Sequence, residues 1–217
     1  MKFIRKKPEL LAPAGDFECL RAAINAGADA VYFGLQEFNM RARARNFKIS
    51  DLPKIARICK PQGVKKYLTL NTIIYDGELK EVEKIIKKVK PYVDAVICSD
   101  MSVMMLCRKH GVGFHVSTQC SVSNSKTADF YKRLGAQRIT LARELSLKQI
   151  KKIAKVVPVE IFIIGKTTGI LRCKIKSMEI NKKSVDKVRK GQDVAIKLPK
   201  CRKGDEVYLI VKTPLTQ

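Results

Sequence analysis

Polar residues suited to proton transfer and ligand binding follow several short apolar runs of this 217-residue chain. Histidine and carboxylate side chains transfer protons, and guanidinium groups bind anionic oxygens through paired hydrogen bonds. We expect catalytic roles for His115, Gln119 and Glu144. We expect substrate contacts from a wider set: Asn39, Arg41, Arg43, Arg45, Asn71, Asn124 and Arg143.

The segment NMRARARNF, residues 39–47, is the least ordinary part of this set. It places Arg41, Arg43 and Arg45 at alternating positions. Three guanidinium groups on one loop suit a phosphate or a carboxylate, which they bind by bidentate hydrogen bonds. The alternative is a charged, solvated loop in which one or two arginines have structural roles.

An alternation of strand-like and helical segments positions these residues. Strand-like runs occupy residues 9–15, 28–34, 66–74, 93–100, 113–119, 137–143 and 159–163. The stretches between them are amphipathic at helical spacing; in residues 79–89, for example, Val82, Ile85, Ile86 and Val89 share one face. Seven strands alternating with six helices indicate a parallel α/β sheet covered by helices.

The leading fold is an incomplete TIM-like (β/α) barrel of about seven strands, and a doubly wound open sheet is the alternative. No G-x-G-x-x-G or G-x-x-x-x-G-K-[ST] motif supports the open sheet. Barrel enzymes carry their catalytic groups at the C-terminal ends of the strands, which would gather the polar residues at one mouth. Taken singly, Asp16 and Asp100 also suit helix caps, and Glu144 a solvated surface position. An incomplete barrel leaves its outer strands unpaired, so we also expect self-association through open sheet edges.

The net charge of +24 is the largest bulk signal in the composition. Residues 1–162 hold 30 Lys and Arg against 15 Asp and Glu, and the remainder is basic as well. A solvated lysine-rich surface explains part of this excess, but its size favours a polyanionic partner, RNA or DNA. No apolar run reaches the roughly 20 residues that span a bilayer, and no secretory signal follows the basic start.

Seven cysteines without C-x-x-C spacing, together with two histidines, give no metal-binding pattern. Free thiols indicate a reducing compartment, so we expect a cytoplasmic protein. No G-x-S-x-G nucleophile turn is present either.

Six segments together resemble the collagenase-like peptidases, family 32 of the peptidases of unknown catalytic type. They are PELLAPAGD (8–16), AGADAVYFG (26–34), FNMRARARNF (38–47), HVSTQCSVSN (115–124), LARELSL (141–147) and EIFIIG (160–165). The resemblance implies a barrel-type N-terminal domain. It also implies either peptidase activity, as the family label says, or oxygen-independent hydroxylation of tRNA uridines, rRNA cytidine or a quinone precursor.

Some members of the family hold an iron–sulfur cluster on cysteines, and the resemblance places two of these at positions 168 and 175. This chain has Thr168 and Ile175 there, so we expect no cofactor. Residues 165–217 are instead similar to the end of the β-barrel domain of translation elongation factors. We therefore expect a truncated barrel domain over 1–164 and a partial β-barrel over 165–217, joined by an internal deletion.

Three functions follow from these observations. The preferred one is a role related to RNA base hydroxylation, in a chain inactivated by loss of the cysteine-bearing stretch. A peptidase or other hydrolase is the first alternative, and a non-catalytic RNA-binding protein is the second. Each RNA-based function has tRNA or rRNA as partner, consistent with the positive charge.

Overall fold

The computed structural model describes residues 8–40 and 45–162, and in the C-terminal part residues 177–180, 183–184 and 195–197. The chain divides into two compact units, residues 1–162 and 163–217. We describe each unit by itself.

The first unit is a parallel α/β sheet whose strands follow one another in sequence order. Within its described residues the strands are β1 (Leu11–Pro13), β2 (Ala30–Gly34), β3 (Lys65–Leu70), β4 (Ala95–Cys98), β5 (Phe114–Val116), β6 (Arg138–Thr140) and β7 (Val159–Glu160). The order β1-β2-β3-β4-β5-β6-β7, with every pair parallel, is that of a (β/α) barrel short of closure. The predicted incomplete barrel is confirmed, and the doubly wound sheet is excluded because its strand order would reverse.

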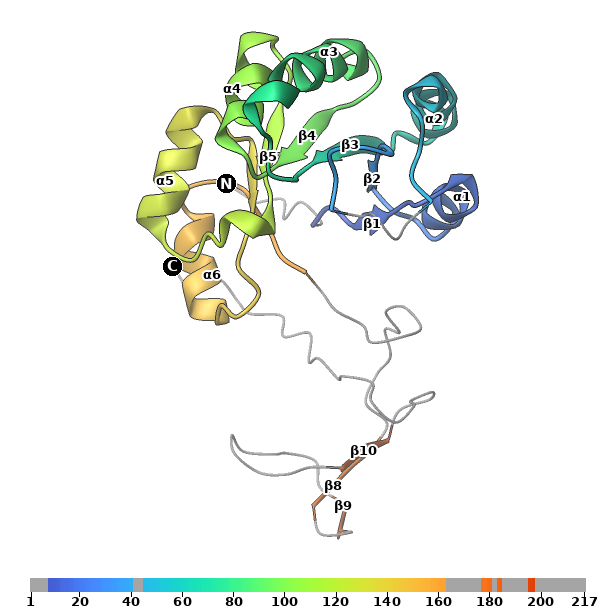
Figure 1. Cartoon of the computed structure of the whole chain (residues 1–217). Coiled ribbons are helices and arrows are strands. Elements are labelled where there is room, and N and C mark those ends of the chain that lie inside the picture. Colours follow the sequence, from blue (N-terminus) through green and yellow to red (C-terminus); the bar gives the residue numbers. More distant parts are fainter. Residues whose placement is uncertain (1–7, 41–44, 163–176, 181–182, 185–194, 198–217) are drawn as a thin grey trace, which may run out of the picture. The chain divides into compact units, whose positions relative to one another are not determined.

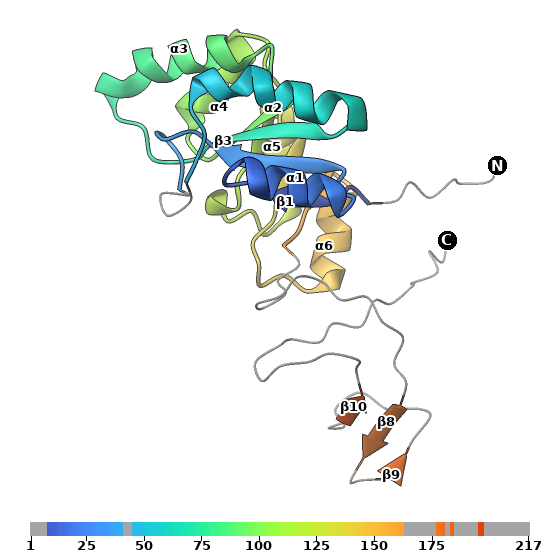
Figure 2. The ribbon, with the colours of Figure 1, turned by 90° about the vertical axis from the view of Figure 1, so that its right-hand side faces the viewer.

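Six α-helices connect the strands. Within residues 8–40 and 45–162 they are α1 (Phe17–Asn25), α2 (Leu52–Cys59), α3 (Leu79–Val89), α4 (Met101–Lys109), α5 (Ser125–Leu134) and α6 (Leu147–Ala154). The same residues include four shorter 3-10 helices: η1 (Ile49–Asp51), η2 (Lys60–Gln62), η3 (Asp76–Glu78) and η4 (Thr118–Cys120). Figure 1 shows the α-helices as an arc outside the strands, and Figure 2 gives the arrangement turned by 90°.

The main hydrophobic core lies between the outer face of the sheet and these helices. The face of α3 predicted from its spacing is buried as expected, with Val82, Ile86 and Val89 fully enclosed. α6 begins with the capping box formed by Ser146 and Gln149. Leu147 is exposed, because it is the first residue of α6 and precedes the turn that packs on the sheet.

The inner face of the sheet encloses a second, smaller apolar cluster of Ala30, Tyr67, Ala95 and Ile97. Beside it lies a partly buried ionic network centred on Glu9, just before β1. The Glu9 carboxylate accepts hydrogen bonds from Arg138 Nη1 at 2.6 Å, Lys65 Nζ at 2.8 Å and the Tyr67 hydroxyl at 2.9 Å. Glu9 thereby connects the segment before β1 with β3 and β6 across the barrel interior. Its partner Arg138 lies 129 residues further along the chain.

Several predicted strands are shorter in the structure. β5 ends at Val116 rather than at 119, because the Ser117 side chain caps η4 and turns the backbone away from the extended conformation. Side chains at every second position of a strand lie on one face, which would put His115, Ser117 and Gln119 together. Because the strand ends, this alternation extends only to Ser117. β1 and β7 each pair with one neighbour among the described strands, and self-association through them stays a prediction.

The described residues of the second unit form an antiparallel sheet of order β10-β8-β9. Its strands are β8 (Ser177–Ile180), β9 (Lys183–Ser184) and β10 (Ala195–Lys197). The predicted relation of residues 165–217 to a translation-factor barrel stays a prediction, since most of that segment lies outside the described residues.

Replacement of Glu9 by glutamine should destabilise the first unit in a pH-dependent way. Burial opposes ionisation of Glu9, but hydrogen bonds from Arg138, Lys65 and Tyr67 outweigh it and hold its pKa at about 2. A lowered pKa contributes stability above about pH 4.5, and this contribution is lost as the pH falls towards the folded-state value. We expect urea denaturation of Glu9→Gln at neutral pH to show a loss of about 2 kcal/mol, less than for a fully enclosed ion pair.

The difference from the wild type should shrink as the pH is lowered below about 4. Glu81→Gln on the exposed side of α3 makes the same change of charge and should leave the stability nearly unchanged. Equal effects of the two substitutions would show that the Glu9 network does not stabilise the fold.

Candidate active site

A cavity of about 70 Å³ lies inside the barrel towards the C-terminal ends of its strands. Its polar lining comes from Thr69, Asn71, Ser117, Thr118, Thr140 and Glu160. Tyr32, Ile97 and Phe162 supply the apolar part. A cavity of this volume has room for several water molecules or one small ring. Its location is the one that barrel enzymes use for chemistry.

Glu160 is the only ionisable carboxyl group in the lining of this cavity, as far as the described residues show. It pairs with Thr140 across β6 and β7, and the Thr140 hydroxyl donates to Glu160 Oε1 at 3.1 Å. The second oxygen, Oε2, is buried without a hydrogen bond and lies 3.8 Å from Arg138 Nη1. Burial raises the pKa of Glu160, and the hydrogen bond from Thr140 and the charge of Arg138 offset this only in part. The group is therefore suited to hold a proton inside the cavity.

His115 lies on the inner face of the sheet, two residues before Ser117. It is 4% exposed, its ring packs edge-on against Tyr67 at 4.6 Å between centroids, and its Nδ1 has no hydrogen-bond partner. Burial and the charge of Arg138 lower the pKa of His115 to about 3. His115 is thus neutral at physiological pH and does not line the cavity. Its predicted catalytic role stays untested.

Asn71 is the predicted substrate-binding residue that the structure brings into the cavity lining. Its Oδ1 accepts from the Met40 amide at 3.1 Å, and its carbonyl accepts from Ser99 Oγ at 3.0 Å. The segment after β3 is also tied to α4 by the bond from the Ile74 amide to Asp100 Oδ2 at 3.3 Å. Asn71 therefore joins the segments that follow β2, β3 and β4 at the mouth of the barrel.

Three other predicted residues have mainly structural contacts. Gln119 accepts from Ser117 Oγ at 3.2 Å, one residue beyond the cavity lining. Asn124 caps α5 by accepting from the Thr127 amide at 2.9 Å. Asn39 is buried at the end of β2, where its amide group donates to the Leu35 carbonyl and occupies the space in which Gly34 has no side chain.

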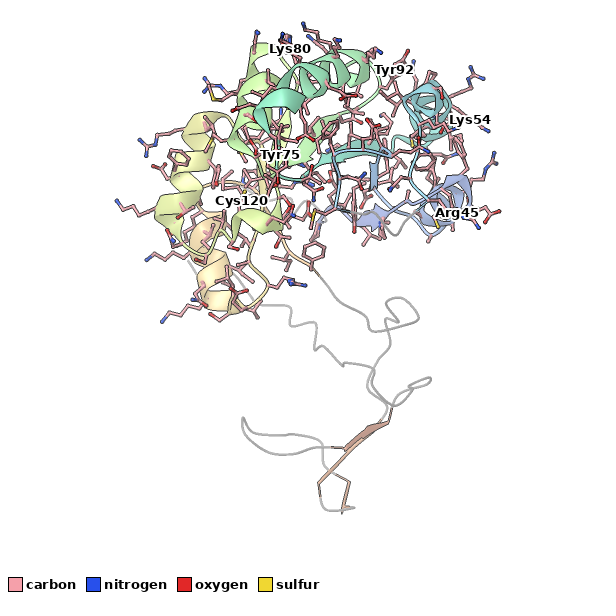
Figure 3. The ribbon with its side chains drawn as sticks, in the orientation of Figure 1. Arg45, Lys54, Tyr75, Lys80, Tyr92 and Cys120 are labelled. Carbon is pink, nitrogen blue, oxygen red and sulfur yellow. The ribbon has the colours of Figure 1, made fainter. Side chains whose placement is uncertain are left out.

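The charged members of the predicted set that the structure describes, Arg45, Arg143 and Glu144, do not line the cavity. Arg45 is exposed and sits 3.9 Å from Asp16, near α1 at the edge of the first unit (Figure 3). Arg143 and Glu144 are exposed in the turn after β6. Arg41 and Arg43 lie outside the described residues. Asp16 and Asp100 accept from the backbone amides of Cys19 and Ser102, so both are helix caps, as the simpler interpretation held.

Sequence reasoning did not assign site roles to Thr69, Thr140 or Glu160, although all three line the cavity. Glu160 is the first residue of the segment EIFIIG (160–165), and this was the one sequence signal that could have identified a residue of the cavity lining. The threonines look like ordinary strand residues, since threonine is common in strands.

The described cysteines do not fit an iron–sulfur cluster. Cys98 and Cys107 are fully buried, and burial raises the pKa of both thiols, whereas a cluster ligand must be a thiolate. No group of three or more His, Cys, Asp or Glu side chains suited to a metal occurs among the residues that the structure describes. Thr168 and Ile175 lie outside those residues. Within the same part of the chain, no helix is long and apolar enough to cross a membrane.

Removal of the Asn71 side chain should loosen the mouth of the barrel. In Asn71→Ala the Met40 amide loses its acceptor, and we expect a loss of about 1 kcal/mol in the free energy of unfolding. Hydrogen exchange of the Met40 amide should become faster. Asn124→Ala removes a helix cap of similar energy elsewhere and serves as the control. Equal exchange rates at Met40 in both variants would contradict the role of Asn71 as a link between the loops.

Comparison with known proteins places this arrangement in a family. Peptidase family U32 matches residues 15–184, a range that continues past residue 165. The collagenase of Porphyromonas gingivalis is 48% identical over 147 residues, which cover 67% of this chain and 35% of the relative. The tRNA hydroxylation protein P1 of Bacillus subtilis is 38% identical over 169 residues, which cover 76% of this chain and 40% of the relative.

The chain thus spans a little over a third of the length of these curated relatives. A solved U32 peptidase shares the fold with a TM-score of 0.58 at 15% identity, over 74% of this chain and 70% of the other. Sequence and fold agree, and the chain belongs to peptidase family U32.

Proposed function

We propose that this chain acts on RNA and is related to the U32 proteins that take part in hydroxylation of tRNA bases. The 38% identity with a tRNA hydroxylation protein over most of the barrel is the observation that carries the proposal. The contribution of the first unit would be to bind the RNA and to present one base to the cavity at the strand ends. Catalytic activity of this chain on its own stays a separate question, because the residues expected to hold a cluster are Thr168 and Ile175.

The distribution of charge supports an RNA partner. The first unit has twice as many basic as acidic residues. Lys80 on α3 projects outward from the helical layer (Figure 3), and Lys54 on α2 is exposed with its Nζ 4.3 Å from the centre of the Phe17 ring on α1. Exposed cations of this kind release counterions from a nucleic acid on binding, which gives affinity without sequence specificity.

Peptidase activity is the second candidate, because the collagenase relative shares 48% identity with the chain. The geometry supports it less. His110 Nε2 lies 2.7 Å from Glu83 Oε1, and His115 Nδ1 has no partner. Neither of these ring nitrogens bonds to a serine, threonine or cysteine as that of a general base would, and Cys98 Sγ reaches only the backbone carbonyl of His115, at 3.9 Å. A non-catalytic RNA-binding protein stays the third candidate. It would bind RNA as the first candidate does, but no base would be modified.

RNA binding should depend steeply on salt. We expect the logarithm of the affinity for an unmodified tRNA transcript to fall linearly with the logarithm of the salt concentration. The triple variant Arg41→Ala, Arg43→Ala, Arg45→Ala should reduce this slope by about 2 to 3, since each lost phosphate contact lowers it by somewhat less than one.

The matched control removes the same charge from α6, as Lys148→Ala, Lys151→Ala, Lys152→Ala. If RNA contacts the loop at residues 41–45, the control should change the slope less than the arginine variant does. An unchanged slope in the arginine variant would remove this loop from the RNA-binding surface.

The isolated chain should not retain a four-iron cluster. The expected ligand positions are threonine and isoleucine, and the described thiols are buried or dispersed. Iron and acid-labile sulfide measured after anaerobic purification should be far below one cluster per chain. A content of roughly four irons per chain with the matching visible absorption would contradict this expectation.

A further inference from the structure

Three of the hydroxyl groups that line the barrel cavity donate their hydrogens to oxygen atoms of the protein. Thr69 Oγ1 donates to the Phe33 carbonyl at 3.1 Å, and Thr118 Oγ1 to the Leu141 carbonyl at 3.2 Å. Ser117 Oγ donates to Gln119 Oε1 at 3.2 Å. A hydroxyl has one hydrogen and two lone pairs, so each of these groups offers its oxygen to the cavity as an acceptor.

Two groups of the cavity lining can donate a hydrogen bond to a ligand. Asn71 uses its Oδ1 to accept from the Met40 amide, which leaves its Nδ2 hydrogens for a ligand. Glu160 has one oxygen engaged by Thr140 and the other, Oε2, buried without a hydrogen bond. A buried polar atom without a partner costs free energy, and a bound ligand group would satisfy it.

The size of the cavity suits one small ring. The volume of about 70 Å³ corresponds to several water molecules, which matches a single pyrimidine ring rather than a whole nucleotide. Phe162 is part of the lining and is 46% exposed, so its ring is available for stacking. Proteins that read single-stranded RNA commonly take one unstacked base into such a pocket.

We propose that Glu160 is a base-recognition residue, whose protonated carboxyl group donates from Oε2 to a carbonyl oxygen of one uracil ring held in the barrel cavity. Asn71 Nδ2 donates to a carbonyl of the same ring, and a hydroxyl oxygen of the lining accepts from its N–H. This inference rests on the proposed function, which it deepens by naming the residue that selects the base. Uracil fits better than cytosine, because cytosine offers an amino group where Glu160 also offers a hydrogen.

The ionisation of Glu160 should therefore control binding of the ring. Burial raises the pKa of Glu160, as described above. The charged groups that act on it directly are Arg138 on β6 and Glu9 before β1, and His115 on β5 and Tyr67 on β3 adjoin that pair. Glu9 stays ionised and His115 and Tyr67 stay neutral from about pH 5 to about pH 8, because their pKa values lie outside that range. Loss of binding across this range thus reports on Glu160.

The test is binding of free uridine to the full chain, measured by ligand-observed NMR from about pH 5 to about pH 8. Uridine carries no phosphate, so its binding is independent of the basic surface. In the wild type the affinity should fall as the pH rises and Glu160 ionises. In Glu160→Gln the side-chain amide replaces the acid as a permanent donor, so the affinity should be independent of pH and close to the wild-type value at low pH.

Glu160→Ala should weaken uridine binding about tenfold at low pH, the effect of one lost hydrogen bond to the ring. Glu81→Gln on α3 makes the same charge change outside the cavity and should behave as the wild type. Thermal melting of each variant verifies that it is folded. If the alanine variant fails to fold, Glu160→Gln still tests the role of Glu160, because it preserves the size of the side chain.

Two results would overturn the inference: a folded Glu160→Ala variant that binds uridine as tightly as the wild type at low pH, or a folded Glu160→Gln variant that does not bind uridine. Stronger binding of cytidine than of uridine would overturn the choice of base. Binding of tRNA without binding of uridine would contradict the role of Glu160 and leave the proposed function standing. Binding of uridine without binding of tRNA would contradict the proposed function instead.

Discussion

The ion pair of Glu9 and Arg138 is the interaction on which the arrangement of the barrel interior depends. A parallel sheet is held locally by hydrogen bonds between adjacent strands, and these alone do not fix the distance between strands far apart in the order. Glu9 contacts β3 and β6 at the same time, through Lys65, Tyr67 and Arg138. Because both charges of the pair are largely withdrawn from water, the additional hydrogen bonds to Glu9 are needed to offset their desolvation.

The same pair sets the chemistry of the cavity. Arg138 Nη1 lies 2.6 Å from Glu9 and 3.8 Å from Glu160, so the guanidinium is committed to the first carboxylate and only weakly available to the second. The negative charge of Glu9 adds to the effect of burial on Glu160. One arginine between two carboxyl groups therefore leaves them in different states, with the pKa of Glu9 lowered and that of Glu160 raised.

The sequence predicted the features that depend on local pattern. The spacing of apolar residues in α3, the caps at Asp16, Asp100 and Ser146, and the strand–helix alternation each involve residues close in the chain. The contacts of the barrel interior instead join residues on different strands. Glu9 meets Arg138, and Thr140 meets Glu160, only once the register of the parallel strands is set. Periodicity carries no information on which strand ends meet across a barrel, so the polar residues chosen by position alone included helix caps and exposed side chains.

In the proposed function, the charged exterior and the interior cavity of the first unit would have separate parts in RNA recognition. Lysine and arginine side chains on the helices attract any polyanion and discriminate little between sequences. Discrimination requires hydrogen bonds to the edge of a base in a site that excludes water, where a mismatched donor or acceptor is left unsatisfied. In the first unit, the cavity lined by Asn71, Thr140 and Glu160 offers hydrogen-bonding groups for such contacts. In the proposed function, the high net charge would serve capture of the RNA, and selection of the base would fall to these groups.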